Sequence, residues 1–209
     1  EENWDMGIYA KILQDSITGI YRTNAANKIL QFINRIRNES DVNQARRFLI
    51  ELMQNARDLA YKKPDGTPEA ASICIRLSDT GLEFSHNGKV FSVKDILSII
   101  YQVSSKKPGE GIGQFGTGFM STYQLSERVE LTSYLKNDDN PYLPFTVCLD
   151  RSGLNKEEIL DAIERAMAHL MAADQAEGIP DEEFDLTGYN TSFLYHLDQE
   201  RSREIARIG

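Results

Sequence analysis

Cysteine is scarce in this 209-residue sequence: Cys74 and Cys148 are far apart, and both lie in apolar stretches. A pair without CxxC spacing gives neither a zinc-binding signature nor a disulfide framework. We therefore expect two buried free thiols, the usual state in a reducing cytoplasm.

Long hydrophobic runs are absent as well. No apolar stretch approaches the roughly 20 residues that a membrane-spanning helix needs, and the first residues carry no signal-peptide pattern. We therefore expect a cytoplasmic location and no interaction with membranes. The sequence has no initiator methionine and stops at Arg-Ile-Gly, so we expect it to be a fragment of a larger multidomain protein.

Positive charge is in deficit, with 23 lysines and arginines against 32 acidic residues and a net charge of −9. A field of that sign repels phosphate backbones at long range, so we expect no direct nucleic-acid binding by this segment. A buried phosphate pocket is still compatible with this charge, because backbone N–H groups can bind an anion locally. The hydrophobic fraction of 41% is enough for a core and excludes wholesale disorder.

The apolar pattern switches between helical and strand periodicity without βαβ repetition. It predicts an α+β fold, a two-layer α/β sandwich in which helices cover one face of a mostly antiparallel sheet. The expected helices span about 1–40, 42–61, 92–102 and 120–125, and the expected strands span 72–77, 82–85, 128–134, 144–149 and 191–197.

Residues 151–185 form an acidic segment, with three basic and ten acidic residues. Apolar residues at helical spacing, from Ile159 to Leu170, predict an amphipathic helix inserted between two strands. We expect this insertion to be mostly solvated, and a surface that docks a partner is the alternative.

A polar stripe is predicted on the second helix. At about 100° per residue, Glu51, Asn55 and Asp58 fall on one side, beside the apolar stripe that faces the sheet. Glu51 is a candidate general base that holds a water and accepts its proton. Asn55 is a candidate ligand for Mg²⁺, which prefers hard oxygen donors. A solvated stripe without chemistry is the simpler interpretation of these residues alone.

Glycine is concentrated at positions 111, 113, 116 and 118, just before a short predicted helix. Such a loop leaves room for an anion and turns backbone N–H groups toward it. The stretch is not a P-loop, because no Gly-Lys-Ser/Thr follows, and it lacks the βαβ context of a dinucleotide-binding fingerprint. A flexible turn is the alternative.

Two further stretches are polar. Residues 84–91, Phe-Ser-His-Asn-Gly-Lys-Val-Phe, include the end of the hairpin, and a turn is their simplest interpretation. In 104–107, Ser-Ser-Lys-Lys, Lys106 or Lys107 can reach a phosphate, although a solvated lysine is more usual.

Together these motifs resemble the GHKL ATPases, the superfamily of gyrase B, Hsp90, histidine kinases and MutL. Residues 51–58, Glu-Leu-x-x-Asn-Ala-x-Asp, are similar to the family's N-box, and 112–123 are similar to the Hsp90 glycine motif almost residue for residue. Residues 190–197 resemble the last motif, in which a threonine begins a strand. The order and spacing agree over roughly 25–200, and the form of 84–91 resembles the sacsin-like and other Hsp90-related branches.

The resemblance implies one Hsp90-like ATP-binding domain over 1–209, with the Bergerat fold, that binds ATP or ADP with Mg²⁺. Within it, Glu51 is the catalytic base and Asn55 the Mg²⁺ ligand, while Asp58 and Thr191 belong to a polar network near the adenine. The glycines cradle the phosphates. The other nucleotide-binding residues that it implies are His86, Asn87, Gly88, Lys106, Gly113, Gln114, Phe115, Gly116, Thr117, Gly118 and Phe119.

The sequence departs from the family in two places. Family members usually carry an aspartate that accepts the adenine amino group, and the aligned residue here is His86, followed by Asn87 and Gly88. Asp79 precedes the return strand and is better interpreted as part of the hairpin turn. We therefore expect relaxed base selectivity. The stretch from Gly88 to Gly113 is short, so we expect a minimal ATP lid.

The function that these motifs predict is a chaperone-like ATPase module whose nucleotide state drives conformational change or dimerisation of a larger protein. Its expected partners are downstream domains of the same chain and a second copy. We expect turnover well below the ~10 s⁻¹ typical of enzymes, because the cation that stabilises the γ-phosphate comes from a following domain in the family. The alternatives are a histidine-kinase-type catalytic domain and a nucleotide-binding module with degenerate catalysis.

Overall fold

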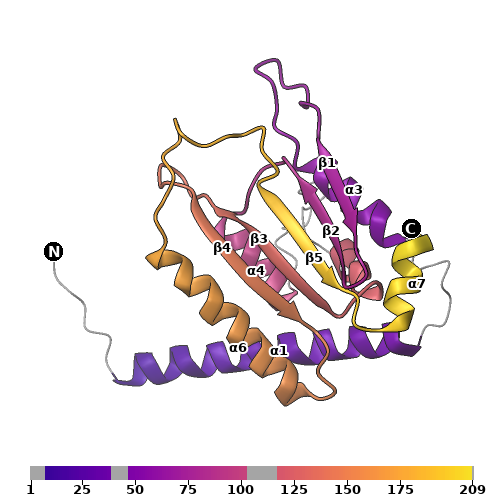
Figure 1. Ribbon diagram of the computed structural model, residues 1–209. Helices are drawn as coiled ribbons and strands as arrows, with labels where there is room; N and C mark the ends of the chain where they lie inside the picture. Colours follow the sequence, from indigo (N-terminus) through magenta and orange to yellow (C-terminus); the bar gives the residue numbers. More distant parts are fainter. Residues whose placement is uncertain (1–7, 39–46, 103–116, 209) are drawn as a thin grey trace.

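The computed structural model of the protein describes residues 8–38, 47–102 and 117–208 (Figure 1). The described chain forms an α+β structure with a five-stranded sheet in the order β1-β2-β5-β3-β4. All neighbouring strands in this sheet pair antiparallel, as the sequence predicts. The strands are β1 (Ile73–Leu77), β2 (Gly81–His86), β3 (Arg128–Leu135), β4 (Leu143–Asp150) and β5 (Thr191–His196).

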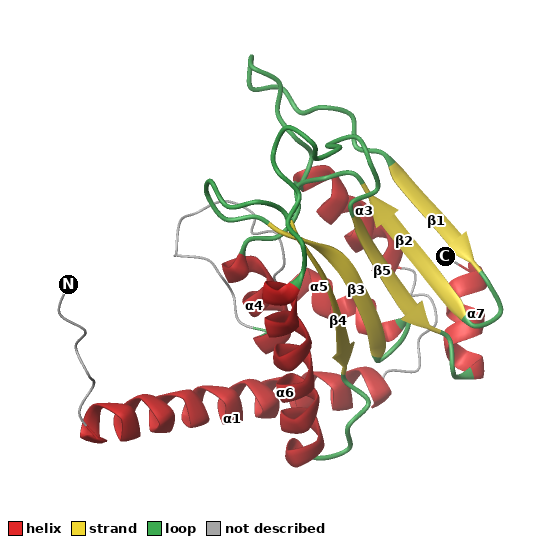
Figure 2. Ribbon diagram, turned by 60° about the vertical axis from the view of Figure 1, so that its left-hand side comes forward, coloured by secondary structure: helices red, strands yellow, loops and turns green. Residues whose placement is uncertain are grey.

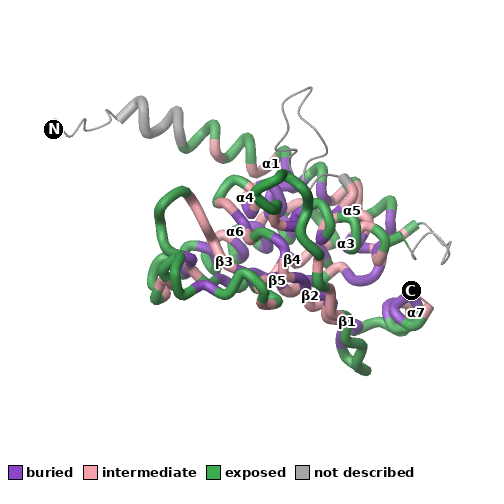
Figure 3. Tube along the Cα trace, turned by 90° about the horizontal axis from the view of Figure 1, so that it is seen from above, coloured by how far each residue is buried: buried purple, intermediate pink, exposed green. Residues whose placement is uncertain are grey.

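Most helices form the second layer. Figures 2 and 3 show α1, α3, α4, α5 and α6 on one face of the sheet, while α7 lies near the end of the β1–β2 hairpin. Within the described ranges, no helix is both long and apolar enough to cross a membrane. The helices are α1 (Ile8–Asn38), α3 (Arg47–Asp58), α4 (Val93–Tyr101), α5 (Thr117–Ser121), α6 (Lys156–Ala172) and α7 (Glu200–Ile208), with short 3₁₀ turns at Thr122–Gln124 and Ala173–Gln175.

The two faces of the sheet follow from the alternation of its strands. Successive side chains of a strand point to opposite faces, and in β3 the buried residues Val129 and Leu131 alternate with more exposed ones. On the open face, Thr132 and Thr146 share a hydrogen bond of 3.0 Å between their hydroxyl oxygens. The core therefore lies between the sheet and the helices, which is the predicted two-layer arrangement.

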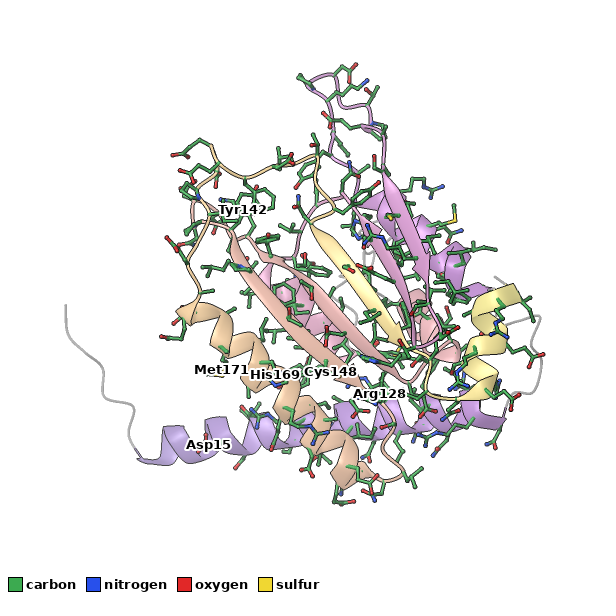
Figure 4. The ribbon with its side chains drawn as sticks, in the orientation of Figure 1. Asp15, Arg128, Tyr142, Cys148, His169 and Met171 are labelled. Carbon is green, nitrogen blue, oxygen red and sulfur yellow. The ribbon has the colours of Figure 1, made fainter. Side chains whose placement is uncertain are left out.

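Helix α6 is part of this core. Asn155 caps its first turn, because its side-chain oxygen accepts a hydrogen bond from the Glu158 N–H at 3.0 Å. Ile159 and Ile163 are fully buried against the core, while His169 and Met171 lie on the exposed side (Figure 4). The prediction of an amphipathic helix is confirmed: one face of α6 belongs to the core, while most residues of 151–185 are exposed.

Two cations fix the point where the chain leaves α4. The fully buried Arg151 donates from Nη2 to the Ile100 carbonyl at 2.7 Å, and Lys28 donates from Nζ to the Gln102 carbonyl at 3.1 Å. Gln102 itself ends the helix in a left-handed conformation with φ 51°. Cations at a helix C-terminus are favourable because they meet unpaired carbonyls, so the C-terminal end of α4 is anchored.

Both cysteines are free, as predicted, but they are half-buried rather than buried. The reason is their register: Cys74 pairs with Ser85, and Cys148 pairs with Glu130. These positions alternate with the inward-facing ones, so both cysteines belong to the open face of the sheet. Partial burial and the neighbouring Asp150 carboxylate raise the pKa of the Cys148 thiol.

Candidate functional site

The carboxylate of Glu51 on α3 lies directly against Gly118 of α5. A Cβ atom added at Gly118 would collide with the Glu51 Oε2 and would lie 3.3 Å from its Cδ. Only a residue without a side chain leaves this space to the carboxylate. The structure thus brings together the polar stripe of α3 and the end of the glycine-rich motif, which are far apart in the sequence.

Asn55 lies one helical turn after Glu51 and is half-buried. Its Nδ2 is a buried atom without a hydrogen-bond partner. An unsatisfied buried donor costs about 1–3 kcal/mol, so it marks a place where a ligand can supply the missing partner. Because the two ends of an amide exchange places when the group turns over, Asn55 can also present its oxygen there to a cation.

The C-terminal end of α3 holds the segment that follows β2. The Leu59 carbonyl accepts a hydrogen bond from the Lys89 N–H at 2.7 Å. A Cβ at Gly88 would lie 2.9 Å from the Leu59 Cβ and 3.1 Å from its carbonyl oxygen. Gly88 is therefore needed for the close approach of this segment to α3.

His86 ends β2 and points into the protein, with only 1% of its surface exposed. Its Nδ1 accepts a hydrogen bond from the Gly88 N–H at 3.0 Å, and its ring stacks on Phe193 at 6.3 Å between centroids. Its Nε2 is buried and has no partner. Burial lowers the pKa of His86 to about 4, so the ring is neutral at pH 7.

Aromatic packing connects this histidine to α5. Phe193 also packs against Phe119, with 5.5 Å between ring centroids, and Phe119 follows Gly118 in the chain. These contacts connect two sides into one continuous group of neighbours. One side consists of α3 and its end, with Glu51, Asn55 and Leu59. The other side consists of His86, Phe193 and Phe119. We call the group Glu51, Asn55, His86, Gly88, Gly118, Phe119, Thr191 and Phe193 the site cluster.

Thr191 is fully buried opposite His86 in the register of β2 and β5. Its hydroxyl shares a hydrogen bond of 2.7 Å with the buried hydroxyl of Ser133. Ser133 was not predicted as a site residue, although a signal exists. It follows Val129 and Leu131 in the inward-facing alternation of β3, where a polar residue is out of place unless it has a partner.

Two predicted residues have hydrogen bonds within the scaffold. The Asn87 side-chain oxygen accepts a hydrogen bond from the Ser72 N–H at 2.7 Å, so it ties the segment to the chain leading into β1. Asp58 is exposed, and its carboxylate accepts a hydrogen bond from Arg57 at 3.1 Å. Among the described residues no hydrogen bond joins Asp58 to Thr191, and their shared network near the nucleotide stays a prediction.

Several predicted residues cannot be placed. Lys106, Gly113, Gln114, Phe115 and Gly116 lie outside the described residues. Thr117 is the first residue of α5, and only its backbone is described. Across the described residues, no three His, Cys, Asp or Glu side chains gather as a metal-binding group.

Comparison with known proteins gives one short similarity. No protein-family model matches the sequence. Over 74 residues the chain is 31% identical to a protein described as chaperone protein HtpG from Myxococcus xanthus (strain DK1622). The matched region covers 32% of this chain and 11% of that protein. Part of the chain is therefore similar to about a tenth of a bacterial chaperone.

Proposed function

We propose that the protein is a GHKL-type module that binds ATP with Mg²⁺ in the site cluster and hydrolyses it slowly. The observation that carries this proposal is the contact between Glu51 of α3 and Gly118 of α5. A carboxylate beside a backbone without a side chain can hold a water next to a phosphate that approaches the same backbone. The short similarity to a chaperone is in line with this family.

Several residues of the cluster have a task in this proposal. Glu51 accepts the proton of the attacking water, because its carboxylate is the acidic group beside the glycine. Gly118 gives the terminal phosphate access to the main chain. We assign the base to the His86 end of the cluster, two turns further along α3, where the rings of Phe84 and Phe193 flank the histidine.

Asn55 is the residue that would hold Mg²⁺. Its amide already has a buried end without a partner, which fits a site that is completed by a ligand. Mg²⁺ is usually bound by few protein groups together with the phosphates of its substrate. A bound Mg²⁺ would neutralise phosphate charge, and its affinity should depend on the nucleotide, since no acidic metal cluster exists in the described chain.

We further propose that the nucleotide state changes the conformation or dimerisation of a larger, cytoplasmic, chaperone-like protein. The support is indirect: it consists of the family resemblance and the short similarity to a chaperone. The proposal is limited to the nucleotide-dependent module, because the match covers only 11% of the length of that chaperone.

The direct test is nucleotide binding by calorimetry, with Mg²⁺ and with EDTA, followed by a steady-state phosphate-release assay. We expect ATP to bind more tightly with Mg²⁺ than with EDTA, and phosphate to be released well below the ~10 s⁻¹ typical of enzymes. Absence of ATP binding under both conditions would refute the proposal. Phosphotransfer to a histidine of a partner protein would instead support the histidine-kinase alternative.

A further inference from the structure

Strand β1 is an edge of the sheet, and half of its backbone groups face outward. The Ser78 N–H donates to the Gly81 carbonyl at 2.8 Å, and the Asn87 N–H donates to the Ser72 carbonyl at 3.2 Å. Hydrogen-bonded and non-hydrogen-bonded positions alternate along an antiparallel pair. The odd-numbered residues of β1 therefore direct their N–H and carbonyl groups away from β2, where no strand of the described chain pairs with them.

The side chains along this edge are apolar and uncovered. Ile75 and Leu77 belong to the same alternate set as Ile73, which packs against the core. Ile75 is nevertheless 45% exposed and Leu77 51% exposed. Figures 1 and 2 show β1 as the outermost strand, with α7 beside the end at which β1 enters its turn. A row of unpaired backbone groups beside exposed apolar side chains is a template for one more strand.

Native proteins normally protect such an edge with proline, with charge or with a covering segment. The other edge strand, β4, contains Pro144, and immediately before it Tyr142 exchanges two backbone hydrogen bonds of 2.9 Å with Ile179. Strand β1 contains no proline. Its one charged residue, Arg76, lies on the open face and pairs with Glu83 at 3.4 Å. The contrast indicates that the edge of β1 is left open for pairing.

The turn end of β1 has a basic neighbour. A cavity of about 210 Å³ lies between this end and α7, and Arg203 and Arg207, one helical turn apart and both exposed, line it from the α7 side. Arg203 donates from Nε to the Leu197 carbonyl at 3.1 Å, and within the described residues neither arginine pairs with a carboxylate. The acidic residue that lines the cavity is Asp79. Two cations against one acid make this spot locally positive on a chain with a net charge of −9.

We propose that the free edge of β1 and helix α7 form a docking groove for an extended acidic segment of a partner protein. The segment adds a strand antiparallel to β1, bonds to the outward backbone groups, and covers Ile75 and Leu77 with its own apolar residues. An antiparallel strand begins beside Leu77, so its first residues lie at the cavity, where carboxylates meet Arg203 and Arg207. The inference does not depend on nucleotide binding.

The experiment titrates the full chain into a fluorescent synthetic peptide, Asp-Asp-Val-Thr-Val-Thr-Val, and measures polarisation. We expect this peptide to bind about tenfold more tightly than the same peptide with two lysines in place of the aspartates, the difference that two exposed ion pairs can make. Arg207→Glu should remove the preference. Arg165→Glu, at an exposed position of α6, is the matched control and should keep it. Equal binding of the two peptides to the wild type would overturn the inference.

A second measurement tests the strand pairing without changing the protein. In the antiparallel register the valines of the peptide lie opposite the odd-numbered residues of β1 and direct their N–H groups toward it, while the threonine N–H groups point away. We expect N-methylation of the central valine to abolish binding and N-methylation of the preceding threonine to leave it unchanged. Equal effects of the two methyl groups would overturn the inference, and so would failure of the acidic peptide to bind.

Sedimentation of the chain without peptide checks the alternative occupant. We expect a monomer at the concentrations of the titration, because the groove is assigned to an acidic segment rather than to a second copy. Self-association that Ile75→Lys abolishes, and that Leu186→Lys at an equally exposed position does not, would assign the edge to a second copy and overturn the inference. The calorimetric test of nucleotide binding is unaffected by either result.

Discussion

The carboxylate of Glu51 occupies the space in which a side chain at position 118 would begin. An added Cβ at Gly118 collides with Oε2, and the Cδ of the same carboxylate lies 3.3 Å away. This contact joins α3 to α5, and through Phe119 it reaches Phe193 in the sheet. The geometry of the proposed catalytic group is therefore set by a glycine as much as by the acid.

The first prediction follows from this contact. Gly118→Ala should displace the Glu51 carboxylate and lower phosphate release at least tenfold, because a misplaced base loses much of the ~10²–10⁴-fold that general-base catalysis contributes. The matched control is Gly19→Ala in α1, where an added Cβ meets nothing within 4 Å. Phosphate release by the folded variants decides the matter, and an unchanged rate in Gly118→Ala would show that the carboxylate has room to move without loss.

The second prediction separates two carboxylates on one helix. Glu51→Gln should keep nucleotide affinity and lower hydrolysis by about 10²–10⁴-fold. Asp58→Asn removes an exposed carboxylate that pairs with Arg57 and should change neither quantity. Calorimetry and phosphate release on both variants test this pair, and hydrolysis that survives in Glu51→Gln would make Glu51 a structural residue.

The third prediction concerns the metal. Asn55→Ala should remove the difference between ATP affinity in Mg²⁺ and in EDTA, because the amide is the protein's contribution to the cation. Gln54→Ala, an exposed amide on the neighbouring position of α3, should retain that difference. If the Asn55 variant still bound Mg·ATP more tightly than ATP alone, another residue would hold the metal.

The fold was predictable because its strands are short, apolar and regularly alternating. The hairpin of β1 and β2 illustrates this: its strands and the turn at 78–81 were expected from the sequence, and Ser78 N–H donates to the Gly81 carbonyl at 2.8 Å. Helix α7 was missed because its nine residues are mostly charged and bury few side chains, among them Ile205 and Ala206. Such a helix is stabilised by its neighbours and carries a weak pattern.

The expected burial of Cys74 was wrong, because the apolar surroundings were given more weight than the alternation of the strand. In β1 the alternation places Cys74 on the open face, and Ile75 and Leu77 of the alternate set are themselves exposed at this edge of the sheet. The segment 151–185 was expected to be amphipathic and mostly solvated, and Ile159 and Ile163 are buried while most of its other residues are exposed. Periodicity decides which face a side chain occupies, and the packing of neighbouring elements decides how far that face is buried.

The site could be predicted as motifs but not as contacts. Spacing on one helix is a local property, so Glu51 and Asn55 were correctly expected on one side of α3. The approach of Gly88 to Leu59, and of Gly118 to Glu51, depends on how distant segments pack, and no local pattern encodes it. The roles of these residues stay predictions until the variants are measured.

The fourth prediction concerns pH, and it does not require a ligand. In the unfolded chain a histidine has a pKa near 6.5, whereas burial lowers the pKa of His86 in the folded protein to about 4. Between these values the unfolded chain takes up a proton that the folded protein does not. Stability from the neutral ring is therefore complete above about pH 6.5 and is lost as the pH falls toward 4.

The size of this effect sets the experiment. Each pH unit between the two pKa values is worth about 1.4 kcal/mol, so lowering the pH from 7.5 to 5 should cost about 2 kcal/mol through His86 alone. Urea unfolding at both pH values measures the loss, and His86→Gln should lose less than the wild type by that amount because glutamine does not titrate. His169→Gln, which removes an exposed histidine, should behave like the wild type. An equal loss in the wild type and in His86→Gln would mean that the imidazole is hydrated in solution and that its burial does not lower its pKa.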